Sequence, residues 1–198
     1  MAPKNPVEQR LQSQPRLIVI SAPSGAGKTT LCQMLLSEFS QIKSSISLTT
    51  RKKRPNEVDG IHYHFITRKE FEAKRDKGEM AEWAVVHSEL YGTPRSLIEQ
   101  TLKAGKHLLF NIDVQGAMNL KKIYGTKVLL IFIRPPSMEE LNRRLRQRQA
   151  DSVSSIETRL QNAYNELRWS KNFDYEVIND KLDQAYKGLR LIIQKECP

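Results

Sequence analysis

The sequence contains very little cysteine, with only Cys32 and Cys197 among its 198 residues. The two cysteines lie far apart and lack the spacing of metal ligands, so we expect neither a disulfide framework nor a cysteine metal site. Cys32 falls in a helical pattern, where a buried thiol is the ordinary role. Unpaired cysteines indicate a reducing compartment, and we expect a cytoplasmic protein.

Long apolar runs are also missing. The longest, residues 128–133, is far too short to span a bilayer, so we expect no membrane partner. The first 15 residues, MAPKNPVEQRLQSQP, contain three prolines and no apolar core, which excludes a secretory signal. We expect a flexible tail at residues 1–14 and one α/β domain at residues 15–198.

Negative charge is in short supply, with 32 Lys and Arg against 22 Asp and Glu, a net charge of +10. This balance favours anionic partners. The basic residues cluster at 51–54 (RKKR) and 143–148 (RRLRQR), without the interleaved aromatic residues that stack single-stranded bases. We therefore expect a site that gathers several phosphate groups and no nucleic-acid partner. A basic solvated surface is the alternative.

A glycine-rich segment, SAPSGAGKTT at residues 21–30, follows a short apolar run and precedes an amphipathic stretch. Gly25 and Gly27 allow a tight turn that aims backbone N–H groups inward, and the dipole of the following helix adds positive potential. Lys28 can reach the outer phosphates of a nucleotide, and the Thr29 hydroxyl can ligate Mg²⁺. The segment predicts an ATP-binding phosphate loop made of Ser21, Ala22, Pro23, Ser24, Gly25, Ala26, Gly27, Lys28, Thr29 and Thr30.

Strand-like and helix-like apolar patterns alternate along most of the chain. The strand-like runs do not alternate in polarity, which suits a parallel sheet covered on both faces; they are residues 17–20, 107–112, 128–133 and 175–178. The helix-like runs are residues 29–39, 94–104, 137–148, 156–167 and 182–193. This order predicts an α/β fold with a parallel sheet flanked by helices.

Residues 42–93 interrupt the alternation, because they are rich in Thr, Tyr, His, Phe and charged residues. We expect them to form a small mixed β lobe inserted between two parts of the core, at about 15–41 and 94–198. Residues 148–156 are polar and lie between two helical patterns. This composition predicts a mobile lid over about 144–160.

Several short motifs, taken in order, resemble those of guanylate kinases from about residue 16 onwards. After the phosphate loop they are SLTTRKKR at 47–54, HYHF at 62–65, AEW at 81–83, YGTP at 91–94, NIDVQG at 111–116 and IRPPS at 133–137. The resemblance implies Mg²⁺-dependent transfer of the γ-phosphoryl group of ATP to GMP, giving ADP and GDP, in purine nucleotide recycling. No motif demands a 2′-hydroxyl, so we also expect dGMP as an acceptor.

The resemblance implies one set of residues for GMP. The residues matched to its phosphate are Arg51, Arg54 and Tyr63, with Tyr91 as a further phosphate or ribose contact. Guanidinium groups suit this role because they make forked, charge-assisted hydrogen bonds to phosphate oxygens. Guanine presents donors at N1 and the 2-amino group and an acceptor at O6, which carboxylates and hydroxyls complement. The residues matched to the base are Glu82, Asp113, Ser47 and Thr93.

A second set serves phosphoryl transfer. The attacking phosphate oxygen is already anionic, so catalysis needs positioning and charge neutralisation rather than a strong base. Lys28 and a Mg²⁺ ion on Thr29 would neutralise the β- and γ-phosphates. By resemblance, the lid and catalytic arginines are Arg144, Arg148 and Arg159, and Asn179 is the adenine-side contact. Closure of the lid would exclude water.

Three positions depart from the family pattern. Ala22 replaces a glycine of the phosphate loop, which we expect to matter little because the turn rests on two later glycines. Asn111 replaces an acidic residue, and an amide cannot give a Mg²⁺-bound water a full negative charge, so the metal role of this position is in doubt. Gln149 replaces a common glycine, which predicts a stiffer lid hinge.

Two other functions fit parts of the pattern. A kinase-like module that binds phosphopeptides without catalysis would not need the residues Lys28, Thr29, Arg148 and Arg159, which are all present. A kinase for another phosphorylated acceptor, such as a ribosyl bisphosphate, would not need the guanine-reading residues. The sequence favours a guanylate kinase over both, and leaves the choice between monomer and homo-oligomer open.

Overall fold

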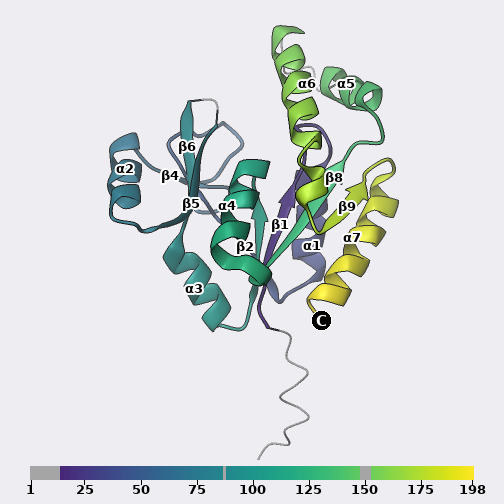
Figure 1. Cartoon of the computed structure of the whole chain (residues 1–198). Coiled ribbons are helices and arrows are strands. Elements are labelled where there is room, and N and C mark those ends of the chain that lie inside the picture. Colours follow the sequence, from purple (N-terminus) through teal and green to yellow (C-terminus); the bar gives the residue numbers. More distant parts are fainter. Residues whose placement is uncertain (1–13, 87, 148–152) are drawn as a thin grey trace, which may run out of the picture.

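The computed structural model describes residues 14–86, 88–147 and 153–198 (Figure 1). Within this part of the chain there are two sheets. The larger is parallel throughout, with the strand order β2 (Ile42–Ser44), β7 (His107–Asn111), β1 (Leu17–Ser21), β8 (Val128–Arg134) and β9 (Tyr175–Ile178). The predicted α/β class is therefore confirmed, and so is a separate, smaller mixed sheet.

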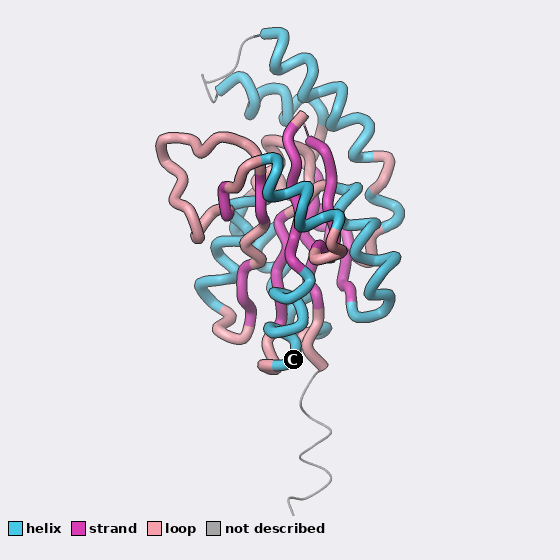
Figure 2. The backbone as a smooth tube through the Cα atoms, turned by 90° about the vertical axis from the view of Figure 1, so that its left-hand side faces the viewer, coloured by secondary structure: helices cyan, strands magenta, loops and turns pink. Residues whose placement is uncertain are grey.

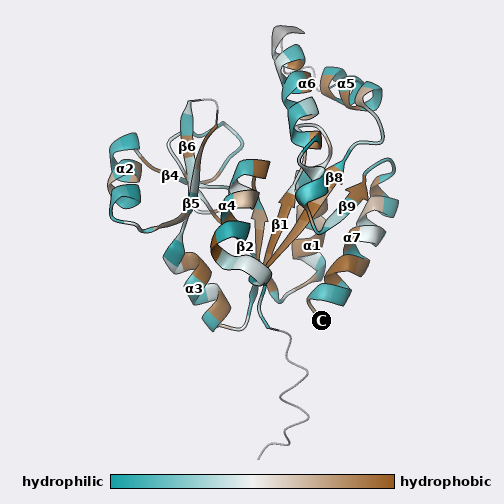
Figure 3. Ribbon diagram, in the orientation of Figure 1, coloured by the Kyte–Doolittle hydropathy of each residue, from teal (hydrophilic) through white to brown (hydrophobic). Residues whose placement is uncertain are grey.

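Helices cover both faces of the parallel sheet. In Figure 2 its strands form a central layer between the helices. They are α1 (Lys28–Glu38), α3 (Arg95–Lys103), α4 (Val114–Tyr124) and α7 (Leu182–Glu196). Alternate residues of β1 face opposite layers: Ile18 and Ile20 pack with α1 and α7, and Leu17 and Val19 pack with α3 and α4. Because both faces are buried, β1 and β8 are apolar along their length (Figure 3).

The smaller sheet has the strand order β4 (His64–Phe65), β3 (Leu48–Thr49), β6 (Glu89–Pro94) and β5 (Met80–Val86). Strand β3 runs parallel to β4 and antiparallel to β6. Its small apolar cluster contains Leu48, Met80 and Leu90, together with Phe71 of α2 (Arg68–Asp76). This sheet is inserted between β2 and α3.

Among the strands and α-helices of the described residues, the sequence pattern did not predict β2, α2 and α4. β2 lies in the range expected for the inserted lobe, yet it pairs with β7 in the core sheet. It is three residues long, too short to show a period. α2 buries only Phe71 and is held by a capping box between Thr67 and Glu70, so it lacks an apolar stripe.

Two further helices, α5 (Met138–Gln147) and α6 (Val153–Leu167), pack against each other above the carboxyl edge of the parallel sheet (Figure 1). Their contact includes Leu141, Leu145 and Ile156. Ser137 accepts a hydrogen bond from the Glu140 N–H at 3.2 Å, as an N-cap should. The segment at the centre of the predicted lid, 148–152, lies outside the described residues, as do Arg148 and Gln149 themselves.

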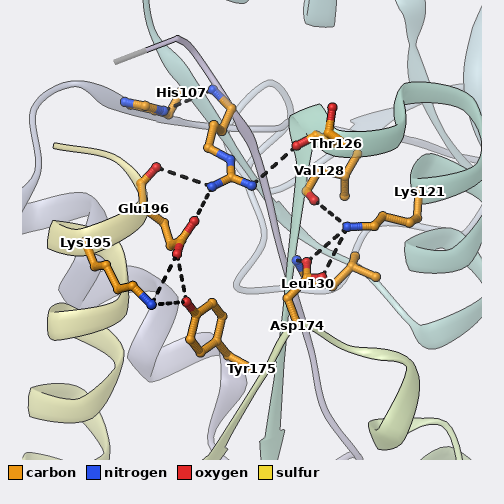
Figure 4. A network of polar contacts seen from close by, with 10 residues as sticks. His107, Lys121, Thr126, Val128, Leu130, Asp174, Tyr175, Lys195 and Glu196 are labelled. Atoms are coloured by element: carbon orange, nitrogen blue, oxygen red, sulfur yellow. Dashed lines mark hydrogen bonds and ion pairs between the residues drawn. The ribbon is translucent and has the colours of Figure 1, made fainter. Parts of the chain in front are cut away.

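At the opposite end of β1, a polar network joins the start of the domain to its last helix (Figure 4). The Arg16 guanidinium donates to the Glu196 carboxylate and to the Thr126 carbonyl, the latter at 3.3 Å. The Arg16 N–H donates to Nδ1 of His107 at 3.1 Å, and burial lowers the pKa of His107, which keeps this acceptor neutral.

A helix that spans a membrane must be both long and apolar. No helix among the described residues meets both requirements.

Candidate functional site

Two adjoining cavities lie at the carboxyl edge of the parallel sheet, where ligands of such sheets ordinarily bind. The first has a volume of about 310 Å³ and is lined by the phosphate loop, Asp113 and Glu166. The second has a volume of about 290 Å³ and lies toward the smaller sheet, lined in part by Glu82 and Tyr91. Lys28, Thr29 and Asp113 line both, so two bound groups would meet beside them.

The phosphate loop takes the predicted turn. Gly25 and Gly27 have φ angles of 94° and 91°, in the left-handed region that favours glycine. The Ala26 N–H closes the turn on the Pro23 carbonyl at 3.0 Å. Ala22 is not among the described residues with positive φ, and its methyl group packs into the core at 6% exposure. A glycine is therefore not required at position 22.

Lys28 and Glu166 are two half-buried charged groups of the first cavity. The Lys28 ammonium donates to the Ile112 carbonyl, just after β7, at 2.9 Å, and burial lowers its pKa. Burial also raises the pKa of Glu166 to about 7, although the nearby Lys28 opposes this shift. Sequence reasoning missed Glu166, because it sits in a polar stretch of α6 that carries no motif.

The predicted arginines of the helix pair occupy different places. Arg159 of α6 reaches the phosphate loop, where its Nη1 donates to the Ser24 hydroxyl at 2.9 Å. Arg144 of α5 donates instead to the carbonyls of Asn179 and Asp180, at 2.9 and 3.1 Å, and to the Glu140 carboxylate at 2.8 Å.

Asn179 follows β9 and lies beside the phosphate loop. The sequence predicts an adenine contact for this residue, but its described side-chain hydrogen bond runs from Nδ2 to the Ala26 carbonyl, at 2.7 Å. Only 4% of Asn179 is exposed.

The second cavity holds a buried chain of three polar side chains. The Thr93 hydroxyl donates to Glu82 Oε1 at 2.8 Å, and Ser47 Oγ lies 3.1 Å from Thr93 Oγ1. Because the single hydroxyl proton of Thr93 goes to Glu82, Ser47 is the donor in the second contact. Glu82 and Thr93 are paired residues of β5 and β6, and burial raises the pKa of Glu82 to about 7.

Asp113 and Gly116 complete this end of the cavity. Asp113 caps α4 through Oδ1, which accepts from the Gly116 N–H at 2.8 Å. A Cβ atom added at Gly116 would lie 3.3 Å from Glu82 Oε2 and 3.4 Å from Asp113 Oδ1. Glycine thus lets the first turn of α4 pack closely against the Glu82 carboxylate of β5, whereas Asp113 is the N-cap of α4 itself. Gly116 belongs to the NIDVQG motif, but the sequence alone gave it no role.

Two of the residues predicted for the acceptor phosphate, Tyr63 and Tyr91, line the second cavity, and Arg51 lies against both of them. Arg51 makes a forked ion pair with Glu57, at 2.7 and 3.0 Å, and donates to the Tyr91 hydroxyl at 3.1 Å. Its guanidinium also lies 5.6 Å from the ring centre of Tyr63. Arg54 is exposed, and its backbone N–H donates to Glu57 at 2.8 Å.

Glu57 therefore holds the Arg51 side chain in place, and its hydrogen bonds with Arg51 lower its pKa to about 2. The sequence analysis did not single it out, because an acidic residue in a charged loop gives no specific signal.

The described residues contain no cluster of three or more His, Cys, Asp or Glu that could hold a metal ion. The oxygens near Lys28 belong to the Thr29 hydroxyl, the Asn111 amide and the carboxylates of Asp113 and Glu166. This set fits Mg²⁺, which keeps several waters and binds through few protein oxygens and the phosphates of a substrate.

Comparisons with known proteins show which family this chain resembles. The family model described as Guanylate kinase matches residues 14–196. A guanylate kinase of Chelativorans sp. (strain BNC1) is 44% identical over 180 residues, which cover 91% of this chain and 83% of the relative. That of Brucella melitensis biotype 1 is 47% identical over 191 residues, covering 96% and 87%. The crystal structure of guanylate kinase from Anaplasma phagocytophilum matches with a TM-score of 0.77 at 32% identity, covering 93% of this chain and 87% of that one.

The raised pKa of Glu82 leads to a prediction about stability. Burial shifts it from 4.5 to about 7, so the folded protein holds this proton more tightly than the unfolded chain. Ionised Glu82 therefore destabilises the fold. The destabilisation grows as the pH rises from 4.5 to about 7 and is constant above pH 7. We expect Glu82→Gln, without ligand, to raise the midpoint of thermal unfolding by a few degrees at pH 8 and by much less at pH 5, since ~1 kcal/mol shifts it by roughly 2–4 °C.

Scanning calorimetry at the two pH values measures this difference. The control is Glu99→Gln, on the exposed surface of α3, which should show no pH-dependent difference from the wild type. An equal shift for Glu82→Gln at both pH values would contradict the prediction.

Proposed function

The chain belongs to the guanylate kinase family, and we propose on this basis that its two adjoining cavities bind ATP and GMP, respectively. The protein is an ATP:GMP phosphotransferase, which moves the γ-phosphoryl group of ATP to GMP and gives ADP and GDP. The observation that supports the assignment of cavities is the buried Ser47–Thr93–Glu82 chain at the second cavity, which shares Lys28 and Thr29 with the cavity of the phosphate loop.

In the GMP cavity, Glu82 and Asp113 accept hydrogen bonds from N1–H and the 2-amino group of guanine. Thr93 orients the Glu82 carboxylate by donating to Oε1. The Ser47 hydroxyl turns from Thr93 and donates to O6. Support comes from the burial of Glu82, which is 5% exposed and has its pKa raised. Hydrogen bonds from the N–H groups of guanine would stabilise the ionised form of Glu82, which burial disfavours.

The GMP phosphate binds at Arg51, Arg54, Tyr63 and Tyr91. Glu57 and the Tyr91 hydroxyl hold the Arg51 guanidinium before any ligand arrives. A side chain that is already ordered loses little conformational entropy on binding, so its hydrogen bonds to phosphate contribute more to affinity.

In the transfer step, an oxygen of the GMP phosphate attacks the γ-phosphorus of ATP. The bond to the β–γ bridging oxygen breaks, and ADP leaves with its electron pair. Lys28 lies between the two cavities and would stabilise negative charge on the phosphoryl group in transit. Arg159, from its position at Ser24, and Arg148 add positive charge there.

Mg²⁺ is the proposed cofactor, and when bound it neutralises the β- and γ-phosphate oxygens. The Thr29 hydroxyl would hold it, and Asn111, which lines the same cavity, would offer an uncharged amide oxygen. We also infer that dGMP is an acceptor, because the proposed contacts do not use the 2′-hydroxyl. The two buried, unpaired cysteines support a reducing, cytoplasmic location and a role in purine nucleotide recycling there.

A coupled assay of ADP release with ATP, Mg²⁺ and each of GMP, AMP, CMP and UMP tests this function. AMP would place the acceptor N1 against a carboxylate and its 6-amino donor against Ser47, and each buried mismatch costs ~1–3 kcal/mol. Two or three mismatches imply that GMP is preferred over AMP by roughly 10⁴-fold in kcat/KM. We expect Glu82→Gln to lower kcat/KM for GMP by roughly 10- to 100-fold and to narrow the gap to AMP.

The control Glu99→Gln should keep wild-type selectivity, because it lies on the exposed surface of α3. If the wild-type protein phosphorylates AMP within tenfold of GMP, the assignment of the base-reading residues is wrong.

The arginines should separate into two kinetic classes. Arg51→Ala and Arg54→Ala should chiefly raise the KM for GMP, because both lie in the acceptor lobe. Arg159→Ala and Arg148→Ala should chiefly lower kcat, each by on the order of 10²-fold, because they act on charge in transfer. Steady-state kinetics with varied GMP measures both constants.

Arg146→Ala is the matched control, since Arg146 lies on α5 within the same basic cluster and its Nε contacts only Asn142 among the described hydrogen bonds. We expect it to keep both constants. Identical KM and kcat effects in all four test variants would refute the division of roles.

The departure at Asn111 can be tested with the metal. Asn111→Asp would place a full negative charge near the proposed Mg²⁺ waters, and should lower the Mg²⁺ concentration for half-maximal turnover several-fold. The GMP to AMP ratio should stay unchanged, because Asn111 is not among the base-reading residues. A Mg²⁺ titration identical to that of the wild type would show that Asn111 has no part in metal use.

A further inference from the structure

Asn179 is held firmly at the end of β9. Its backbone N–H donates to the Arg134 carbonyl at 2.8 Å, and its side chain is buried. Nδ2 donates to the Ala26 carbonyl at 2.7 Å, whereas Oδ1 has no hydrogen-bond partner among the described residues. The opposite amide orientation would set two acceptors, Oδ1 and the Ala26 carbonyl, against each other, so the orientation shown is the one that chemistry allows.

The Ala26 carbonyl and the Gly27 N–H belong to one peptide group. In a trans peptide these two bonds point in opposite directions, and the described residues contain no cis peptide. Ala26 is fully buried, while Gly27 lines the phosphate-loop cavity. When Asn179 holds the carbonyl on the buried side, the Gly27 N–H is turned toward the cavity. The Asn179 side-chain amide thus sets the direction of the Gly27 N–H, which can donate to a bound phosphate.

Two structural constraints require glycine at position 27. A Cβ atom added there would collide with Nδ2 of Asn179, so the amide occupies the space that any side chain at position 27 would fill. The left-handed φ of 91° disfavours other residues as well. Gly27 and Asn179 therefore fit each other, although they are 152 positions apart.

Arg144 supports Asn179 from the other side. Its Nη1 and Nη2 donate to the carbonyls of Asn179 and Asp180, and its Nε donates to Glu140 on the same helix. A continuous set of hydrogen bonds therefore runs from α5 through Arg144 and Asn179 to the phosphate loop.

We propose that Asn179 is a positioning residue that orients the Ala26–Gly27 peptide for phosphate binding, and that Arg144 acts on the loop through Asn179. This inference rests on the proposed binding of donor phosphates at the loop. It differs from the adenine contact implied by the sequence, because Asn179 acts here without touching the base.

The test compares a ligand that has a base with one that does not. Isothermal titration calorimetry would measure the Kd of Mg²⁺-tripolyphosphate and of a non-hydrolysable Mg²⁺-ATP analogue for wild type, Asn179→Ala and the control Asn119→Ala. Asn119 is an exposed residue of α4 and should change neither value. We expect Asn179→Ala to weaken both ligands by the same factor, on the order of tenfold for one lost buried hydrogen bond.

An Asn179→Ala variant that binds tripolyphosphate like the wild type but the ATP analogue more weakly would overturn the proposal, since the residue would then act on adenine. A wild-type protein that fails to bind tripolyphosphate would overturn it as well. Failure of the proposed function is recognised separately, because the selectivity for GMP over AMP reports on the other cavity.

A second variant separates orientation of the peptide from loss of fold. In Asn179→Asp an ionised carboxylate cannot donate to the Ala26 carbonyl, whereas a protonated carboxyl group can. Position 179 is only 4% exposed, so burial should raise the pKa of a carboxyl group there above its ordinary value. The tripolyphosphate affinity of Asn179→Asp, relative to wild type at the same pH, should therefore be lowest at pH 8 and rise as the pH falls, whereas Asn179→Ala should show no such rise. An Asn179→Asp variant that binds tripolyphosphate like the wild type at pH 8 would overturn the proposal.

The part played by Arg144 is tested by a double-mutant cycle with tripolyphosphate. If Arg144 acts through Asn179, the variant Arg144→Ala/Asn179→Ala should bind no more weakly than Asn179→Ala alone. Losses that add would show that Arg144 acts independently of Asn179 and would overturn this part of the inference.

Discussion

The parallel direction of β1, β7, β8 and β9 is the constraint on which the site depends. Parallel strands bring their carboxyl ends to one edge, so segments far apart in the chain meet there. The phosphate loop follows β1, Asp113 follows β7 and Asn179 follows β9. The hydrogen bond from Lys28 to the Ile112 carbonyl joins the first two of these segments. The polar network around Arg16 secures the opposite end of the same sheet.

Burial of charged groups supports the substrate recognition that we propose for this site. Burial lowers the pKa of Lys28 and raises those of Glu82 and Glu166, so each is partly deprived of the water that favours its charged form. Phosphate oxygens and guanine N–H groups are the partners that such charges lack. A wrong base leaves the buried groups mismatched, which is why selectivity should be high although the site uses few side chains.

The helix pair α5–α6 is coupled to the phosphate loop by three different contacts. Arg159 donates to Ser24, and Arg144 supports Asn179, which holds the loop carbonyl. A Cβ atom added at Gly25 would lie 3.0 Å from Leu145, so α5 packs closely over the turn. The direction of the loop N–H groups and the position of these helices therefore depend on each other.

The phosphate-loop turn and the strands of the parallel sheet could be predicted from the sequence, and the structure contains both. Apolar runs, glycines and short motifs are local signals that can be recognised in a sequence. A strand such as β1 gives a clear signal because all of its residues are buried. The sequence did not reveal β2 or α2, which have too few buried residues to show a period. The contacts of Gly116 with Glu82 and of Asn179 with Ala26 are visible only in the folded chain, because they join segments that are far apart in the sequence and depend on how the sheets and helices pack. Glu57 lies only six residues from Arg51, but their forked ion pair depends on the irregular path of one loop, which residue spacing does not predict.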